Sequence, residues 1–193
     1  MKECRVPESE GIGPRRLLFL DRDGTIIVER NFPRNPDEVE LLPGAAAAIR
    51  RLRARGLAVV VVSNQSGIGR GYLTFEDASR VNARLLELLA AEGTTLDAIY
   101  FCPHAPADGC GCRKPRSGLL LKAAEEFGAD LSRSFLVGDK AADVEAGRAV
   151  GTTTVLVRTG YGAAQLFPPG RGPDLLAEDL GAAARLIEPL LDG

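Results

Sequence analysis

Five short runs of apolar residues, with no regular alternation of polar positions, recur along the chain. Runs of this length that are rich in Val, Ile, Leu and Phe are typical of strands buried on both faces of a sheet. The sequence therefore predicts five interior strands, at about 16–21, 57–64, 96–101, 134–139 and 152–158.

The segments between these runs carry signals for helices. Pro43 and Gly44 open an Ala-rich stretch, and Thr74 with Asp77 forms the pair expected of a capping box. Glycines that favour a left-handed backbone follow several of these stretches and are expected to end the helices. The predicted helices span about 43–54, 74–92, 117–127, 141–150 and 180–191.

Strands and helices alternate along the whole chain. This order predicts an α/β fold, a three-layer, Rossmann-like parallel sheet with helices on both faces. Residues 24–36 are expected to form a loop or small flap, and the roughly 40 residues between Asp23 and Ser63 are used up by this flap and one helix. We therefore expect no large cap domain, and a single domain over 15–193 after a flexible extension over 1–14.

The composition excludes several classes of protein. With 193 residues, 45% hydrophobic and 26% charged, the chain has the composition of an ordinary soluble domain. Its net charge of -2 gives no sign of the basic surface that nucleic-acid-binding proteins carry. No apolar run approaches the ~20 residues that cross a bilayer, and the first residues lack the apolar middle of a secretory signal. We expect a cytoplasmic monomer with a small-molecule substrate and no nucleic-acid or membrane partner.

Polar residues stand at the carboxyl ends of the predicted strands. Asp21 and Asp23 follow the first strand, Ser63 ends the second, Lys114 comes after the third and Asp139 ends the fourth. Ligands bind at this edge of parallel α/β sheets, so we expect these side chains to meet there. Two carboxylates aimed at one point indicate a cation or a shared proton between them.

Three of the four cysteines and the single histidine of the chain fall in one short stretch. Four such ligands suit tetrahedral Zn²⁺ and close its coordination sphere, which predicts a structural zinc rather than a catalytic one. The zinc loop, residues 102–112, runs directly into Arg113 and Lys114 and would fix them. The alternative is a group of unliganded cytosolic thiols. The predicted ligands are Cys102, His104, Cys110 and Cys112, whereas Cys4 is expected to be a free thiol.

Several motifs, in this order, resemble one known family. "DRDGT", "SNQ", "RKP" and "GDKAAD" resemble the four motifs of the haloacid-dehalogenase-like phosphatases over about residues 16–160. Together with "CPH" and "CGCRKP", they are similar to the branch of D-glycero-D-manno-heptose 1,7-bisphosphate phosphatases, which is close to the histidinol-phosphate phosphatases. The resemblance implies removal of the C7 phosphate in the biosynthesis of nucleotide-activated heptose.

The resemblance also implies a role for each motif residue. Asp21 is the expected nucleophile, which forms an aspartyl-phosphate, and Asp23 is the expected general acid and base. Ser63 and Lys114 would stabilise the transferring phosphoryl group. Mg²⁺ would be held by Asp21, the backbone carbonyl of Asp23 and Asp139.

Substrate contacts are expected from a further set of residues. Arg113 would bind the second phosphate of a bisphosphate through its two-pronged guanidinium. Residues 29–32 are expected at the substrate only because the family places contacts there. The full expected set is Arg22, Glu29, Arg30, Asn31, Phe32, Asn64, Gln65, Ser66, Arg113 and Lys140.

Other functions remain open at this stage. The same chemistry could act on histidinol phosphate or another small phosphate monoester. A non-catalytic binding module stabilised by zinc is a more remote alternative. The absence of Trp and the acidic balance speak against nucleic acid, and the intact acidic and basic motif residues speak against lost catalysis.

Overall fold

The computed structural model describes residues 15–192, so the predicted N-terminal extension and Cys4 lie outside the described residues. Its centre is one six-stranded sheet in the order β3-β2-β1-β4-β5-β6, with all neighbouring strands parallel. The five predicted strands are confirmed, and β6 is an addition. The strands are β1 Leu17–Leu20, β2 Ala58–Asn64, β3 Ala98–Cys102, β4 Phe135–Gly138, β5 Thr153–Val157 and β6 Leu175–Ala177.

The five predicted helices are also confirmed, with one change at the last. They are α1 Ala45–Ala54, α2 Phe75–Ala91, α3 Gly118–Phe127, α4 Ala141–Ala149 and α5 Leu180–Ile187. The expected helix over 180–191 ends at Ile187 and continues as a 3₁₀ turn over Glu188–Leu191. Pro189 lies at the start of that turn, and its missing N–H removes the bond that would continue the α-helix.

Local signals explain where the helices begin and end. The capping box of α2 forms as predicted, because Asp77 N donates to Thr74 Oγ1 at 3.0 Å and Asp77 Oδ2 accepts from Thr74 N at 2.7 Å. Gly128 ends α3 with a left-handed φ of 59°, which a side chain would disfavour. These contacts fix the lengths of the helices that connect the strands.

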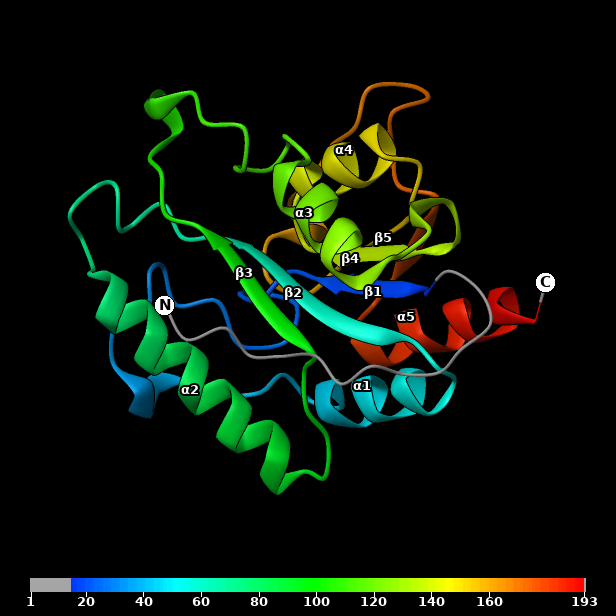
Figure 1. Cartoon of the computed structure of the whole chain (residues 1–193), viewed down its shortest axis with the longest axis horizontal. Helices are drawn as coiled ribbons and strands as arrows, with labels where there is room; N and C mark the ends of the chain where they lie inside the picture. Colours follow the sequence, from blue (N-terminus) through cyan, green and yellow to red (C-terminus); the bar gives the residue numbers. More distant parts are fainter. Residues whose placement is uncertain (1–14, 193) are drawn as a thin grey trace.

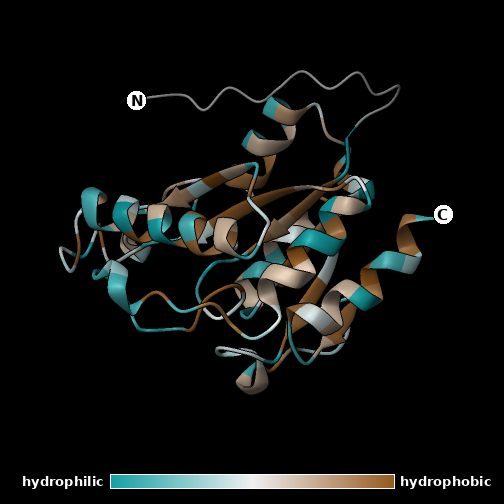
Figure 2. Cartoon of the chain, turned by 90° about the horizontal axis from the view of Figure 1, so that it is seen from below, coloured by the Kyte–Doolittle hydropathy of each residue, from teal (hydrophilic) through white to brown (hydrophobic). Residues whose placement is uncertain are grey.

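Helices cover both faces of the sheet (Figure 1). Leu18 and Leu20 of β1 pack in one core, with α1, α2 and α5. Leu17 and Phe19 point to the opposite face and pack in a second core with α3 and α4. Figure 2 shows the apolar strands between helices whose outer faces are polar. The predicted three-layer architecture is therefore confirmed.

The strand β6 escaped prediction because it is only three residues long. It pairs with β5 from Val155–Leu175 to Val157–Ala177 at the edge of the sheet. Asp174 fixes its register, since Asp174 Oδ2 accepts from both the backbone N and the Oγ1 of Thr154 at 2.7 Å. Three residues are too few to display a period in the sequence.

The order of the strands places a crevice at one edge of the sheet. The chain steps from β1 to β2 and β3 on one side, and then continues with β4, β5 and β6 on the other. The carboxyl ends of β1 and β4 therefore flank a topological switch point, where α/β sheets bind their ligands. Residues 24–36 form the expected flap, tied down by a bridge between Ile27 and Leu41. Within residues 15–192, no large cap domain is inserted, as predicted.

Candidate active site

A cavity of about 450 Å³ opens at the carboxyl ends of the strands, where the switch point predicts a ligand site. Most of the expected catalytic and substrate-binding residues line it, whereas Arg22 and Arg30 do not. The predicted residues in its wall are Asp21, Asp23, Glu29, Asn31, Phe32, Ser63, Asn64, Gln65, Ser66, Arg113, Lys114 and Lys140.

Asp21 lies at the tip of β1 and is almost wholly buried. Burial raises its pKa, but the ammonium groups of Lys114 and Lys140 outweigh burial and hold the pKa of Asp21 below its ordinary value. Lys114 Nζ lies 3.0 Å from Asp21 Oδ1. The Asp21 carboxylate is therefore ionised and able to act as a nucleophile.

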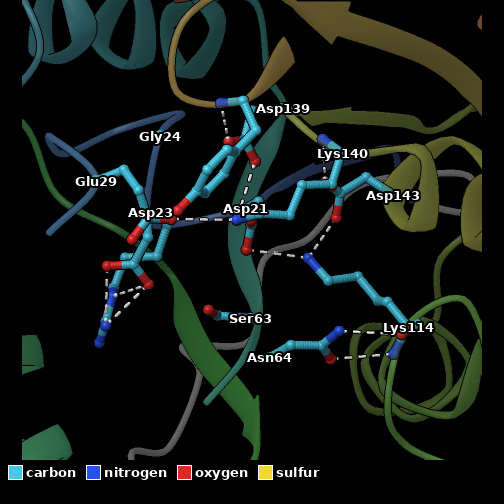
Figure 3. A network of polar contacts seen from close by, with 12 residues as sticks. Asp21, Asp23, Gly24, Glu29, Ser63, Asn64, Lys114, Asp139, Lys140 and Asp143 are labelled. Carbon is cyan, nitrogen blue, oxygen red and sulfur yellow. Dashed lines mark hydrogen bonds and ion pairs between the residues drawn. The ribbon is translucent and has the colours of Figure 1, made fainter. Parts of the chain in front are cut away.

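Lys114 is held between two carboxylates, as Figure 3 shows. Its Nζ lies 2.5 Å from Asp143 Oδ1 and donates to the carbonyl of Val62 at 2.6 Å. Asn64 fixes the Lys114 backbone through a reciprocal pair of hydrogen bonds, both 3.0 Å long. Burial lowers the pKa of Lys114, but the charges of Asp143 and Asp21 raise it further, so the side chain stays an ammonium.

Three buried carboxylates, those of Asp21, Asp139 and Asp143, meet at the carboxyl ends of the strands. Oxygens of Asp21, Asp139 and Asp143 lie within 4.8 Å of one another. Asp139 accepts from the backbone N–H of Tyr161 with Oδ2, whereas its buried Oδ1 has no hydrogen-bond partner among residues 15–192. Burial and the charge of Asp21 raise the pKa of Asp139 to about 7. This oxygen-rich site, short of positive charge, fits Mg²⁺.

Two glycines make room for these acids. Gly24 has a left-handed φ of 81°, and a Cβ there would lie 2.3 Å from Asp139 Oδ2. A Cβ on Gly138 would lie equally close to Asp143. The glycines of the "DRDGT" and "GDKAAD" motifs are therefore required where backbone and carboxylate approach each other.

Asp23 and Ser63 are joined through Gln65. Gln65 Nε2 donates to Asp23 Oδ2 and to Ser63 Oγ, both at 2.8 Å. Arg22 lies behind Asp23, fully buried, and binds its carboxylate instead of reaching the cavity. The expected substrate contact by Arg22 is therefore wrong, because its guanidinium is already paired inside the protein.

The flap supplies part of the cavity mouth. Glu29 Oε2 lies 3.2 Å from Lys140 Nζ, and Asn31 Oδ1 accepts from the hydroxyl of Tyr161 at 2.8 Å. Arg30 is not part of the cavity wall and pairs with exposed Glu40, so its expected substrate contact stays a prediction. The flap thus contributes Glu29, Asn31 and Phe32 to the cavity wall, but not Arg30.

Sequence reasoning missed three residues of the site: Arg70, Asp143 and Tyr161. Asp143 stands in the "GDKAAD" motif but was given no role. Arg70 follows "SNQSGIG" at the end of β2, close to the motif but outside it. Arg70 and Tyr161 have no periodicity that marks them, since their positions depend on how the loops fold back over the sheet, whereas Asp143 lies in α4.

The Cys/His residues also come together as predicted. The sulfur atoms of Cys102, Cys110 and Cys112 lie 3.2 to 3.5 Å apart, and His104 Nδ1 lies 3.5 Å from Cys102 and 3.3 Å from Cys112. These are close to the sulfur spacing of ~3.7 Å around one tetrahedral Zn²⁺. Burial raises the pKa of Cys102 to about 12, a cost that a bound cation would offset. The geometry fits zinc.

A carboxylate at the first strand, a hydroxyl at the second, a buried lysine and an acidic pair at the fourth define the active site of a haloacid-dehalogenase-like phosphatase. A profile of the HAD-hydrolase-like family matches residues 111–183. A heptose-1,7-bisphosphate 7-phosphatase of Pseudomonas aeruginosa is 44% identical over 90% of this chain and 98% of its own. One of Thermosynechococcus vestitus is 42% identical over 90% and 96%.

Solved structures agree with the sequence relatives. The D,D-heptose 1,7-bisphosphate phosphatase of B. bronchiseptica, in complex with magnesium and phosphate, matches with a TM-score of 0.82 and 36% identity, over 90% of this chain and 98% of its own. A HAD-like phosphatase from Mesorhizobium loti matches with a TM-score of 0.80 and 37% identity, over 96% of this chain and 92% of its own. The chain therefore belongs to the heptose 1,7-bisphosphate 7-phosphatase branch of the haloacid-dehalogenase-like phosphatases and is a phosphoric monoester hydrolase.

Proposed function

We propose that the enzyme removes the C7 phosphate of D-glycero-D-manno-heptose 1,7-bisphosphate, in the biosynthesis of nucleotide-activated heptose. Apart from the similarity to the relatives, one observation of the site supports this proposal. The cavity combines a nucleophile at its inner end with two unpaired arginines in its wall, a distribution of charge that suits a substrate with two phosphates.

The two arginines are Arg70 and Arg113. Both line the cavity, and no hydrogen bond or ion pair holds the Arg70 guanidinium among the described residues. The Nη1 of Arg113 is buried and has no partner within residues 15–192. An orphaned buried donor is costly, and a phosphate oxygen would satisfy it. We therefore assign the distal phosphate to Arg113 and Arg70.

The reaction proceeds in two steps at Asp21. Its carboxylate oxygen attacks the phosphorus, the bond between phosphorus and the C7 oxygen breaks, and Asp23 gives its proton to the departing alkoxide. Water then attacks the phosphorus of the aspartyl-phosphate while Asp23 takes a proton from the water. The bond between phosphorus and the Asp21 oxygen breaks, which releases inorganic phosphate and restores the Asp21 carboxylate. Lys114 and Ser63 stabilise charge on the phosphoryl oxygens in both steps.

Magnesium belongs to this proposal. Asp21, Asp139 and the backbone carbonyl of Asp23 would hold it, and Asp139 Oδ1 is a buried oxygen that accepts no hydrogen bond within residues 15–192. When bound, Mg²⁺ supplies positive charge next to the phosphoryl oxygens. Lys140 lies 3.4 Å from Asp139 Oδ1 and 4.0 Å from Asp21 Oδ2, which places a second cation beside the same acids.

Zinc has a structural role in this proposal. Cys102 ends β3, and Cys112 immediately precedes Arg113 and Lys114, so a closed zinc site would fix both residues against the sheet. Arg116 adds to the same loop by donating to the carbonyls of Gly109 and Cys110. The loop buries little apolar surface of its own, and a metal replaces that missing core.

The proposal also covers the cellular compartment and the oligomeric state of the enzyme. Within residues 15–192, no helix has the length and apolar character needed to span a bilayer. We propose a monomer in the cytoplasm that acts on a small phosphorylated sugar, without nucleic-acid or membrane partners.

Phosphorus NMR of the product tests the proposed position of cleavage. Heptose 1,7-bisphosphate, as each anomer, should lose the signal of its C7 monoester and keep that of C1. Loss of the C1 phosphate, or faster hydrolysis of histidinol phosphate, would overturn the assigned substrate and leave only the chemistry.

A further inference from the structure

Arg22 is among the largest side chains that are fully buried, with 1% of its surface exposed. A guanidinium in such a place is costly unless every charge and donor is matched. Its Nη2 donates to Asp23 Oδ2 at 2.9 Å and to Oδ1 at 3.1 Å, and its Nε donates to Oδ2 at 3.1 Å. Arg22 therefore grips both oxygens of its neighbour.

The other end of the guanidinium is tied to a helix. Arg22 Nη1 donates at 2.8 Å to the side-chain oxygen of Asn82, which lies in α2. Asn82 stands on the buried face of α2 beside Val81 and Leu85, where an apolar residue is the rule. The hydrogen bond to Arg22 explains why a polar side chain occupies this position. Through it, α2 is linked to the Arg22 guanidinium that holds Asp23.

Asp23 is held from its second side by Gln65, at 2.8 Å from Oδ2. Asp23 Oδ2 accepts from Arg22 Nε, Arg22 Nη2 and Gln65, whereas Oδ1 accepts only from Arg22 Nη2 among the described residues. These bonds fix the plane of the carboxyl and leave a position on Oδ1 for the proton. Proton transfer requires a heavy-atom distance of about 2.6–3.2 Å and good alignment. A carboxyl that rotated freely at the cavity wall would meet this demand only part of the time.

We propose that Arg22 is a positioning residue for proton transfer: anchored by Asn82, it fixes the Asp23 carboxyl at the oxygen of the leaving group. This rests on the role of Asp23 in the proposed function. Arg22 never touches the substrate, so it acts only through Asp23. A purely structural Arg22, which stabilises the fold by pairing a buried charge, is the competing explanation.

The leaving group separates the two explanations. The alkoxide of a sugar is a poor leaving group and depends on a proton from Asp23, whereas p-nitrophenolate leaves without one. General acid catalysis contributes about 10²–10⁴-fold, and this contribution applies to the alkyl ester alone. The ratio kcat/KM reports the steps up to the phosphorylation of Asp21, so the later hydrolysis does not obscure the comparison.

The experiment measures kcat/KM of Arg22→Met and Arg22→Lys with the heptose bisphosphate, with glycerol phosphate and with p-nitrophenyl phosphate. We expect kcat/KM of Arg22→Met to fall at least about 30-fold with the alkyl esters, which is part of the general-acid contribution. With the aryl ester, kcat/KM should fall less than about 3-fold, because that contribution is not needed. Arg22→Lys keeps the charge without the two-pronged geometry and should fall between. Adding Arg22→Met to Asp23→Asn should cause no further loss, because the two act as a unit.

Controls distinguish a fold defect from a loss of positioning. Thr154→Val breaks a buried polar contact with Asp174 at the far edge of the sheet and should lower the melting temperature with no preference between esters. Asn82→Leu keeps the Arg22–Asp23 pair but removes the hydrogen bond that anchors Arg22. It should therefore lose more kcat/KM with the alkyl esters than with the aryl ester, by a smaller ratio than Arg22→Met. If Arg22→Met does not fold, Asn82→Leu replaces it as the test of the positioning role.

Equal losses with alkyl and aryl esters, or no loss with either, would overturn the proposal. Its failure is distinguishable from that of the proposed substrate. If the wild-type enzyme hydrolyses glycerol phosphate but not the heptose bisphosphate, the substrate assignment fails. The losses of kcat/KM with glycerol phosphate and with p-nitrophenyl phosphate still test the role of Arg22. If Asp23→Asn itself shows no split, the role of Asp23 fails and the proposal with it.

Discussion

Lys114 Nζ lies 3.0 Å from Asp21 Oδ1, and both side chains are almost wholly buried. The contact joins the end of β1 to a residue 93 positions away, at the end of the zinc loop. In this position the ammonium keeps the Asp21 carboxylate ionised, and in the proposed function it lies where phosphoryl charge develops.

Asp21→Asn should abolish turnover, because an amide cannot form the aspartyl-phosphate. The replacement is nearly isosteric, so zinc content and the far-UV circular dichroism spectrum should equal those of the wild type. Turnover is measured as phosphate release at saturating Mg²⁺. Retained turnover would remove Asp21 as the nucleophile.

Asp143→Asn should lower kcat/KM by about 10- to 100-fold, equivalent to ~1.4–2.7 kcal/mol of transition-state stabilisation. Asp143 Oδ1 lies 2.5 Å from Lys114 Nζ and orients it, and an amide weakens this contact without leaving a hole. Asp143 Oδ2 also accepts from the Lys140 backbone N–H at 3.0 Å and caps α4. Asp143→Ala, which loses both contacts, should in addition melt at a lower temperature. Wild-type kinetics in Asp143→Asn would show that Lys114 needs no such partner.

Asp139→Asn should stabilise the metal-free protein while it weakens Mg²⁺ binding. The pKa of Asp139 is raised from 3.8 to about 7, so its stabilising contribution is present below pH 3.8 and is lost as pH rises through 7. The variant should therefore melt at a higher temperature in EDTA at pH 8, by at least about 2 °C, since 1 kcal/mol shifts the midpoint by ~2–4 °C. At pH 4 the difference should nearly vanish. An equal difference at both pH values would contradict the account.

Arg70→Met should raise KM for the bisphosphate about 10-fold or more and leave KM for a monophosphate ester nearly unchanged. The expectation follows from its place in the cavity wall without an ion-pair partner among the described residues. Arg84→Met is the matched control, because Arg84 is a half-exposed arginine on α2 that pairs with Glu87 and with no other acid within residues 15–192. Equal changes with both substrates would remove Arg70 from the distal phosphate site.

Cys110→Ser should lower the zinc content and raise KM through misplacement of Arg113 and Lys114. Zinc is measured by atomic absorption on the purified protein. A chelator strong enough to remove zinc should have the same effect on KM, and added Mg²⁺ alone should not reverse it. Full zinc content in the variant would contradict the ligand assignment.

The sequence predicted the parts of this enzyme that depend on local patterns. Apolar runs revealed β1 to β5, and the spacing of Asp21, Asp23 and the Cys/His residues indicated their chemistry before any contact was known. These signals are carried within a few neighbouring residues. A three-residue edge strand such as β6 has no such signal, because its pairing with β5 and the contact between Asp174 and Thr154 arise only in the folded chain.

The direction of a side chain was harder to predict than its place in the chain. Arg22 stands between Asp21 and Asp23, yet it turns inward because Asp23 and Asn82 offer a buried acceptor to each of its three guanidinium nitrogens. Arg30 turns outward to Glu40 while its neighbours line the cavity. Both depend on contacts with residues distant in sequence, which no motif encodes.

The most direct test of the account is phosphate release from heptose 1,7-bisphosphate, as both anomers, and from histidinol phosphate, with Mg²⁺ and with EDTA. The account predicts Mg²⁺-dependent release, with kcat/KM at least about 10²-fold higher for one heptose anomer than for the other two substrates. This ratio is equivalent to ~2.7 kcal/mol of differential transition-state binding. Equal and poor rates with all three would contradict the proposed substrate. Absence of Mg²⁺-dependent release from any phosphate ester would contradict the assignment of Asp21, Lys114 and Asp139 to phosphoryl transfer.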